Sequence, residues 1–372
     1  MNNYSFTVII PTYNEIANIE NIIKAVLSVL NKSEIDGEIL VVDDNSKDGT
    51  IDAVKNLQKS YSNLNLIVRL EDHGLSQSVV EGFFKAQSDI IQVIDADFSH
   101  PVNLIPQFYY AIEDEKYDVC IGSRYTKGGD IQNWPLKRRV ISLGATGLGR
   151  VLFPDVTDPV SGFFAIKRDV VKNSELKPRG YKILMEVLGK GKWESFKEIP
   201  FTFKDREVGE SKLKISTMTD YISQCINIGL FAFTHHDTKV WKEWMKILKF
   251  GIVGLSGIFV NTAVLFAFTE WAHLYYLISS FFAIEASIIT NFILNDFWTF
   301  KGGSNNKFSR KWKRFLSYQV ISICGTLINM GVLFIFTDLV GLWYIAANII
   351  GILVAFIWNF FVNRNVTWRA TK

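Results

Sequence analysis

The sequence predicts two structural classes in one chain: an α/β domain with an open sheet, then an all-α domain of four transmembrane helices made of a duplicated helix hairpin. The first 240 residues mix charges with the strand and helix periodicities of a soluble α/β domain, whereas long apolar runs begin near Lys249. The length of 372 residues also exceeds what one compact core usually holds. We therefore expect the α/β domain over 1–215, amphipathic linker helices over 216–245 and the membrane domain over 246–372.

The α/β domain is indicated first by two apolar runs, 6–10 and 38–42, which are rich in β-branched residues and flank a helical pattern over 18–30. A strand, a helix and a strand at this spacing form a right-handed crossover unit. Further strands are expected over 64–70 and 117–121. Alternating strands and helices of this kind predict an open sheet whose ligands bind at the carboxyl ends of the strands.

Two turns at those strand ends carry polar groups: Pro-Thr-Tyr-Asn-Glu at 11–15 and Asp-Asp-Asn-Ser at 43–46. A ring, a carboxylate and two aspartates suit a base and a ribose better than a phosphate, which favours glycines and positive charge. Glycine-rich dinucleotide and P-loop patterns are absent from both turns, which argues against those classes. An alternative is that Asp43 and Asp44 only cap the helix expected near Asp48.

Asp95 and Asp97 follow the apolar run 90–94 and precede a turn at Pro101, so they should lie at another strand's carboxyl end. Carboxylates are the ligands that Mg²⁺ and related divalent ions prefer. An ion held here would bridge the two phosphates of a nucleotide-sugar and neutralise the leaving diphosphate. By itself Asp-x-Asp is a weak signal, and a solvated turn is the alternative.

Three further segments carry cations. Arg124 ends the strand 117–121 and can approach the same edge, either for a ligand or for an ion pair with one of the two aspartates. The adjacent cations 137–139 precede an apolar helical stretch to Phe153, which is typical of a segment lying on a membrane surface. The polar loop 206–213 could close over a diphosphate or be an ordinary exposed linker.

Composition adds little about partners. The net charge of +3 is uninformative because the charge is unevenly spread, and we expect no nucleic-acid partner. Cys120, Cys225 and Cys324 have no metal-type spacing and indicate small buried residues in a reducing compartment. The N-terminus leads straight into the first strand, so we expect no signal peptide and a cytoplasmic first domain.

The membrane domain is predicted as a tandem duplication of a helix hairpin. Its four apolar stretches lie near 250–269, 276–295, 316–337 and 344–362. The first and second pairs match with a constant offset of 68 residues, a register that chance does not keep through both helices. The matching pairs are Gly257/Gly325, Asn261/Asn329, Leu265/Leu333, Phe266/Phe334, Asn291/Asn359, Asn295/Asn363 and Thr299/Thr367.

Basic residues predict the orientation of the spans. They precede the first span, separate the second from the third and follow the fourth, so the positive-inside rule places these three segments in the cytoplasm. We expect a multi-pass protein of the plasma membrane. The repeated asparagines favour interhelical hydrogen bonds over a transport path. Glu285 has no acidic counterpart in the second hairpin, and its role stays open.

Six ordered motifs resemble the dolichyl-phosphate mannose synthases of glycosyltransferase family 2, which have a GT-A fold. They are Pro-Thr-Tyr-Asn-Glu at 11–15, Asp-Asp-Asn-Ser-Lys-Asp-Gly-Thr at 43–50, Asp-Ala-Asp-Phe-Ser-His-Pro at 95–101, Gly-Ser-Arg-Tyr at 122–125, Asp-Pro-Val-Ser-Gly-Phe-Phe at 158–164 and Gly-Glu-Ser-Lys-Leu at 209–213. The remainder is similar to the four-span domain appended to archaeal and some bacterial members.

The resemblance implies roles for matching positions. The nucleotide-sugar would be bound by Pro11, Tyr13, Glu15, Val42, Asp44, Asp95, Ala96, Asp97, Arg206 and Lys212. The cofactor Mg²⁺ or Mn²⁺ would be held by Asp95, Asp97 and Ser99, the last a glutamine in many relatives. The lipid phosphate would be received by Arg124, Arg138 and Ser142. Asp97 and Arg124 are the residues expected to act in the chemistry.

The expected reaction transfers mannose from GDP-mannose to dolichyl or another polyprenyl phosphate in the bilayer, with inversion by a single displacement. A phosphate monoester with a second pKa near ~6 is already mostly ionised at cytosolic pH. It needs orientation by cations rather than a strong general base, which accounts for the lack of a catalytic triad in the sequence.

Three alternatives remain open from the sequence. A UDP-glucose polyprenyl-phosphate glucosyltransferase would share the fold and mechanism, although Asp-Asp-Asn-Ser at 43–46 favours mannose. The four spans could act as a sugar-lipid flippase, for which Glu285 is a candidate residue. A membrane-anchored binding module with a dead site is disfavoured because the charged motif residues are present. The sequence leaves the oligomeric state unknown.

Overall fold

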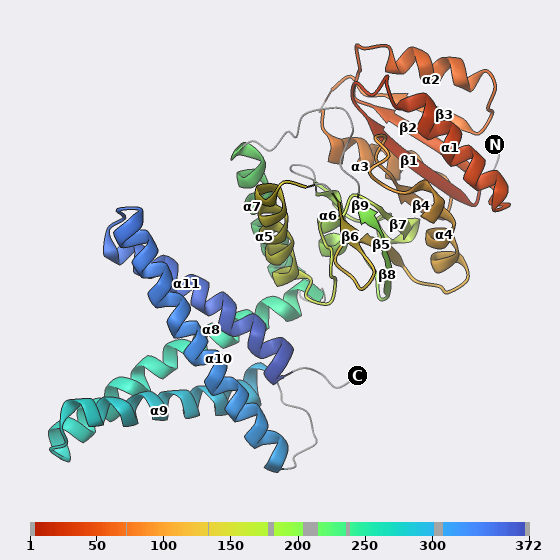
Figure 1. Cartoon of the computed structure of the whole chain (residues 1–372). Coiled ribbons are helices and arrows are strands. Elements are labelled where there is room, and N and C mark those ends of the chain that lie inside the picture. The colour runs from red at the N-terminus through yellow and green to blue at the C-terminus, as the bar shows by residue number, and fades with distance from the viewer. Residues whose placement is uncertain are drawn as a thin grey trace. The chain divides into compact units, whose positions relative to one another are not determined.

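The computed structural model describes residues 4–71, 73–132, 134–177, 182–203, 215–235, 239–300 and 308–368. The chain divides into two compact units, Met1–Trp241 and Lys242–Lys372, which are drawn together in Figure 1. The first unit contains every described strand, and the second is helical. The predicted fold class, an α/β domain followed by four long apolar helices, is confirmed.

The first unit is built on a seven-stranded mixed sheet with the order β3-β2-β1-β4-β7-β5-β8. All neighbouring strands are parallel except β7, which runs antiparallel to both β4 and β5. The strands are β1 (Phe6–Thr12), β2 (Gly37–Asp43), β3 (Leu64–Val68), β4 (Ile90–Val93), β5 (Val119–Ser123), β7 (Phe164–Lys167) and β8 (Phe196–Pro200). A separate two-stranded sheet pairs β6 (Asp130–Ile131) with β9 (Thr202–Phe203).

Helices cover both faces of the large sheet. The helices of this unit are α1 (Ile19–Lys32), α2 (Thr50–Gln58), α3 (Leu75–Lys85), α4 (Ile105–Glu113), α5 (Leu136–Leu152), α6 (Ile183–Lys190) and α7 (Ile215–Thr234), with short 3₁₀ turns η1 (Val102–Leu104) and η2 (Arg168–Val170). In α1 six apolar residues recur at helical spacing and are buried: Ile19, Ile22, Ile23, Val26, Leu27 and Leu30. Burying each contributes roughly 1.5–3 kcal/mol.

The alternation of strand β1 assigns its side chains to the two faces. Phe6, Val8 and Ile10 belong to the main apolar cluster together with residues of α1 and α4. Ile9 points to the other face, where α3 passes so closely that a Cβ on Gly82 would lie 2.7 Å from the Ile9 Cδ1 atom. Glycine at position 82 therefore lets α3 pack directly on the centre of the sheet.

The second unit repeats one helical hairpin. Its helices are α8 (Lys239–Phe266), α9 (Tyr276–Leu294), α10 (Phe308–Phe334) and α11 (Tyr344–Val362), and each ends in a π-helical turn: η3 (Ala267–Trp271), η4 (Asn295–Thr299), η5 (Ile335–Leu339) and η6 (Asn363–Thr367). The turns recur at the 68-residue offset of the sequence repeat. By length and composition, four helices in the described part of the chain can cross a membrane.

The repeated glycines and asparagines form one crossing in each hairpin. A Cβ on Gly257 of α8 would lie 2.5 Å from the Asn291 Nδ2 atom of α9, and a Cβ on Gly325 of α10 would lie 2.5 Å from the Asn359 Oδ1 atom of α11. The amides thus fill the space that each glycine leaves, which brings the helix backbones close together. Ser287 also donates to the Gly257 carbonyl at 2.9 Å. Of the interhelical hydrogen bonds predicted for the repeated asparagines, the described residues show one between Asn295 and Tyr318 of α10.

Polar contacts join the two hairpins to each other. Asp296 at the end of the first hairpin pairs with Arg314 near the start of α10 at 3.0 Å. Arg364 at the end of the second hairpin pairs with Glu243 near the start of α8 at 3.2 Å. Asp296 and Arg364 occupy equivalent positions of the repeat but carry opposite charges. Each hairpin end is therefore tied to the beginning of the other hairpin.

Glu285 lies within α9 and accepts a hydrogen bond from the Gln319 Nε2 atom of α10 at 2.9 Å. Neither residue is matched in the repeat, where Leu353 and Gly251 stand at the equivalent positions. The contact joins the two hairpins, and the repeat does not provide a second copy of it. It gives the intramembrane carboxyl group a helix-packing role.

Candidate functional site

The first part of the candidate site lies at the carboxyl ends of β1 and β2. These strands are parallel, and Pro11 is directly opposite Val42. Asp43 is fully buried and accepts hydrogen bonds from the Thr12 hydroxyl at 2.9 Å and from the Ser46 backbone N–H at 2.7 Å. Asp43 thus holds the two turns together. The two turns leave the sheet side by side, and Asp43 keeps them in this arrangement.

Asp44 is also tied to the protein. It accepts hydrogen bonds from the Arg69 guanidinium at 2.6 Å, the Ser78 hydroxyl at 3.0 Å and the Gly74 backbone N–H at 2.5 Å. The alternative that Asp43 and Asp44 cap the next helix is wrong, because α2 begins at Thr50 after Gly49. Asp44 instead fixes the segment that leads into α3 against the turn after β2.

Tyr13 and Glu15 lie on the turn after β1. The Tyr13 side chain is 52% exposed, and Asn14 has a positive φ of 57°. The Asn14 N–H donates to the Ser46 hydroxyl at 2.8 Å, and the Glu15 N–H donates to the Thr50 hydroxyl at 3.0 Å. The turn is thereby fixed on its backbone while the Tyr13 ring faces solvent and is accessible for stacking.

The acidic turn after β4 contains Asp95, Ala96, Asp97 and Ser99. The Ser99 backbone N–H donates to Asp97 Oδ1 at 3.0 Å, which closes a tight turn with Phe98 at a φ of 58°. Ala96 and Ser99 are buried, whereas Asp95 and Asp97 are partly exposed. The Asp95 side chain is 27% exposed, whereas the Asp97 Oδ2 atom is buried.

His100 supports this turn from behind. Its Nδ1 atom accepts a hydrogen bond from the Asp95 backbone N–H at 3.1 Å, so the ring proton is on Nε2, 3.8 Å from Asp95 Oδ2. Burial lowers the pKa of His100, against the opposing effect of Asp95 and Asp97. The ring stacks on Phe163 with centroids 4.9 Å apart. A neutral imidazole therefore orients Asp95 without adding positive charge.

The donor set of this turn fits a hard divalent ion. Asp95, Asp97 and Ser99 offer oxygen ligands, and in the described residues the buried Ser99 hydroxyl has no hydrogen-bond partner. No group of three or more His, Cys, Asp or Glu with metal-site geometry occurs in the described ranges. Two carboxylates with substrate phosphates and water in the remaining positions are the usual arrangement for Mg²⁺ in phosphoryl sites.

Glycine at position 162 brings another loop onto the acidic turn. A Cβ there would lie 3.6 Å from Asp95 Oδ2 and 3.4 Å from His100 Cε1. Gly162 precedes the antiparallel strand β7, which is inserted between β4 and β5. The segment 158–164 therefore connects the acidic turn to the end of β5.

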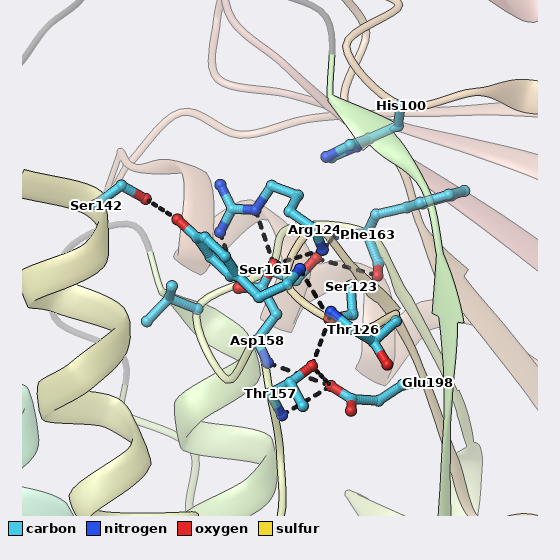
Figure 2. A network of polar contacts seen from close by, with 12 residues as sticks. His100, Ser123, Arg124, Thr126, Ser142, Thr157, Asp158, Ser161, Phe163 and Glu198 are labelled. Atoms are coloured by element: carbon cyan, nitrogen blue, oxygen red, sulfur yellow. Dashed lines mark hydrogen bonds and ion pairs between the residues drawn. The ribbon is translucent and has the colours of Figure 1, made fainter. Parts of the chain in front are cut away.

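Arg124, at the end of β5, is held in a buried ion pair. Its Nε and Nη2 atoms donate to the two carboxylate oxygens of Asp158 at 2.7 and 2.8 Å, as Figure 2 shows. Arg124 is 8% exposed, and Asp158 is inaccessible to solvent. The ion pair predicted between Arg124 and Asp95 or Asp97 is therefore wrong, because the partner of Arg124 is Asp158. Asp158 and the hydrogen bonds it makes raise the pKa of Arg124, against the opposing effect of burial.

Glu198 of β8 fixes the loop that carries Asp158. Its Oε1 atom accepts hydrogen bonds from the Thr157 N–H at 2.9 Å, the Thr157 hydroxyl at 2.7 Å and the Asp158 N–H at 3.2 Å (Figure 2). Thr157 also bonds the Ser123 hydroxyl at 2.6 Å. Burial raises the pKa of Glu198, against the effect of these hydrogen bonds. Glu198 of β8 thus positions Arg124 indirectly, by fixing the loop that carries Asp158.

The helix α5 adds two of the predicted residues. The guanidinium of Arg138 lies over the Trp134 ring, 4.3 Å from its centroid. The Ser142 hydroxyl bonds the Tyr125 hydroxyl at 2.9 Å. Arg124 also lies 5.8 Å from the Trp134 ring centroid, so Trp134 is shared by the two arginines. Aromatic rings thereby hold both cations where solvent is partly excluded.

Known proteins match both parts of the chain. Residues 7–174 match the model of "Glycosyl transferase family 2", and residues 249–368 match that of "GtrA/DPMS, transmembrane domain". A dolichol-phosphate mannosyltransferase of Pyrococcus furiosus is 40% identical over 97% of this chain and 99% of its own length. The chain belongs to the dolichol-phosphate mannosyltransferase family.

Other relatives match the first unit most fully. The dolichol-phosphate mannosyltransferase of Saccharomyces cerevisiae is 32% identical over 66% of this chain and 94% of its own length. A solved structure, glucosyl-3-phosphoglycerate synthase of Mycobacterium tuberculosis in complex with Mn²⁺, UDP and glucosyl-3-phosphoglycerate, is 20% identical over 61% of this chain and 79% of its own, with a TM-score of 0.46. That similarity is too low to contribute to the assignment.

The structure places most of the residues predicted from the sequence at the carboxyl ends of β1, β2, β4 and β5 and on α5. Two of them, Arg206 and Lys212, lie outside the described residues. Lys182 was missed by sequence reasoning, because it belongs to none of the six motifs. It stands directly before α6 and donates to the Val160 carbonyl at 3.3 Å. Burial lowers the pKa of Lys182 to about 8, with Arg124 acting in the same direction.

Proposed function

We propose that this chain transfers mannose from GDP-mannose to dolichyl or another polyprenyl phosphate, with GDP as the second product. The observation that carries the proposal is that loop 158–164 contacts the acidic turn through Gly162 and Arg124 through Asp158, while Arg138 shares the Trp134 ring with Arg124. The 40% identity over nearly the whole chain to a dolichol-phosphate mannosyltransferase supports it.

The donor is proposed to bind over the ends of β1, β2 and β4. Tyr13 is placed to stack on the base, and Pro11 with Val42 forms the floor beneath it. Asp44 contributes by fixing the edge of the nucleotide site, since its carboxylate is engaged by Arg69 and Gly74. Glu15, Ala96, Arg206 and Lys212 remain proposed donor contacts by resemblance.

Asp95, Asp97 and Ser99 would hold Mg²⁺ or Mn²⁺, which when bound supplies positive charge to the donor diphosphate. The acceptor phosphate arrives as an anion, so the protein has to orient it rather than remove a proton. One phosphate oxygen attacks the anomeric carbon, the bond from that carbon to the GDP oxygen breaks, and the configuration inverts. Arg124, Arg138 and Ser142 are proposed to orient the acceptor phosphate.

The reaction is tested with purified protein, radiolabelled GDP-mannose and polyprenyl phosphate, with and without a chelator. We expect a mannosyl lipid that forms only when divalent metal is present. A glucosyl activity with UDP-glucose is the alternative for the donor. Thermal shifts with GDP and with UDP in the presence of Mn²⁺ separate the two, because the cognate nucleotide stabilises the protein more. A larger shift with UDP would contradict the mannosyl assignment.

The proposed location is the plasma membrane, with the first unit in the cytoplasm. Basic residues in the first turns of α8 and α10 support this orientation, including Lys246 and Arg314. The short links after η3 and η5 would then face the outside. Membrane-impermeant labelling of single cysteines at Ala272 and Gly341 in intact cells, in a chain without native cysteines, checks it. Labelling only after permeabilisation would indicate the opposite orientation.

A further inference from the structure

Lys182 is a cation of the site that no motif marks. It is partly buried, and its Nζ atom donates to the carbonyl of Val160, which lies in the loop that carries Asp158 and Gly162. In the part of the chain that the structure describes, no carboxylate lies within ion-pair distance of the Lys182 ammonium. A partly buried ammonium whose acceptor among the described residues is a carbonyl is a good binding partner for an anion.

The neighbouring arginine differs in this respect. Both carboxylate oxygens of Asp158 are engaged by Arg124, and both residues are buried, so the pair is electrically neutral as a unit. Arg124 can donate to a phosphate but adds little net charge. An acceptor phosphate carries ≈ −1.5 to −2 charge near pH 7. Further cations are therefore required to balance it.

Charged groups of four segments act on Lys182. The groups that act on its ammonium are Arg124 at the end of β5, Asp158 in the following loop, Asp95 at the end of β4 and Arg138 on α5. Arg124 and Asp158 form an ion pair with each other, whereas Lys182 and Arg138 each contribute a positive charge. An anion bound there gains from Lys182 and Arg138 together.

We propose that Lys182 binds the phosphate of the polyprenyl phosphate acceptor, next to Arg138, and that this lysine sets the affinity for the acceptor. The inference rests on the proposed mannosyl transfer. A role in donor binding is the alternative, since the charge of Asp95 also acts on Lys182. A purely structural role would require only the hydrogen bond to the Val160 carbonyl.

Two variants separate these roles. Lys182→Gln removes the charge but keeps an N–H donor on a side chain one atom shorter, and Lys182→Arg keeps the charge. The control is Lys177→Gln, which removes the same charge from a side chain that is 80% exposed and pairs with Glu175. All are measured in the full-length protein in detergent with a short-chain polyprenyl phosphate.

We expect Lys182→Gln to raise the KM for the acceptor roughly 10- to 100-fold, the usual effect of losing a charged hydrogen bond. The affinity for GDP-mannose with Mn²⁺, measured by calorimetry, should stay within about two-fold of wild type, and Lys182→Arg should restore the acceptor KM. An unchanged acceptor KM in Lys182→Gln would overturn the inference. A weaker GDP-mannose affinity without a change in acceptor KM would also overturn it.

The pH profile is an independent measurement. A lysine with a pKa of about 8 loses its charge as the pH rises through that value. Because kcat/KM reports the free enzyme, kcat/KM for the acceptor should fall above about pH 8 in wild type and should lose that limb in Lys182→Arg. A limb that persists in Lys182→Arg contradicts the assignment. If wild type transfers no mannose, the proposed function fails, and the Kd of the short-chain polyprenyl phosphate for wild type and Lys182→Gln still decides the role of the lysine.

Discussion

Asp97 is the residue on which the metal proposal can be tested most directly. Asp97→Asn keeps the size of the side chain and its Oδ1 acceptor for the Ser99 N–H, but removes the charge. We expect the melting temperature to stay close to that of wild type while turnover falls by about 100-fold or more, because charge stabilisation of the leaving group is lost. Mannosyl transfer assays with Mn²⁺ measure the effect.

The matched control for that variant is Asp89→Asn, which removes a charge from a carboxylate that is 95% exposed and only loosely paired with Arg168 at 3.8 Å. Its activity should equal that of wild type. Wild-type rates in Asp97→Asn would show that the acidic turn does not hold the metal.

Asp118 gives a prediction about stability and pH. Burial opposes ionisation of its carboxyl group, but hydrogen bonds from the Lys167 ammonium and from the backbone N–H groups of Glu194 and Ser195 outweigh it, and the pKa falls from 3.8 to about 2. A lowered pKa stabilises the fold at pH values above 3.8. That stabilisation is lost as the pH falls through the folded pKa near 2.

Asp118→Asn should therefore destabilise the protein by about 1–2 kcal/mol at pH 7, and the difference from wild type should shrink between pH 4 and pH 2. Thermal melting in detergent over this pH range measures it. Asp169→Asn is the control, since that side chain is 85% exposed. A pH-independent difference between Asp118→Asn and wild type would rule out the ionic explanation.

At the scale of the elements, each hairpin of the second unit depends on one glycine. Gly257→Ala and Gly325→Ala put a methyl group where Asn291 and Asn359 now lie, so the helices must move apart or the amides must move away. We expect each change to cost about 1–3 kcal/mol, as other overpacked cores do. Thermal unfolding in detergent, followed by the reactivity of Cys324 in the second unit, measures the loss.

The same helices supply the controls. A Cβ on Gly254 of α8 or on Gly331 of α10 would meet no atom within 4 Å. Gly254→Ala and Gly331→Ala should be neutral or slightly stabilising, because alanine favours the helix by about 1 kcal/mol over glycine. Equal effects at all four glycines would mean that helix propensity, rather than the crossing, determines the result.

The strands and helices were largely predictable, because periodicity and turn residues are local signals. The insertion of β7 antiparallel between β4 and β5 was not predictable in this way, since no local pattern reports which strands pair. For that reason the sequence placed Arg124 near the acidic turn but missed Asp158 as its partner. Lys182 escaped because its role depends on a contact with Val160, a loop residue distant in sequence.

At the scale of the whole molecule, the two ion pairs of the second unit make the hairpins complementary. Asp296→Arg places a second arginine beside Arg314 and should lower the melting temperature by the equivalent of about 1 kcal/mol. Adding Arg314→Asp should restore the ion pair and most of the stability, although the hydrogen bond from the Trp368 ring to Asp296 is lost. A double variant no better than Asp296→Arg alone would show that the pair does not join the hairpins.

The antiparallel strand β7 also sets the order in which the first unit can be assembled during synthesis. Until the ribosome has released Phe164–Lys167, β4 has no neighbour on one side, and the acidic turn lacks Gly162 and Phe163 behind it. A nascent chain that stalls before Phe164 therefore exposes a bare strand edge, which is a known route to aggregation. The site is complete only after β8 has also been made, because Glu198 of that strand fixes the loop that carries Asp158.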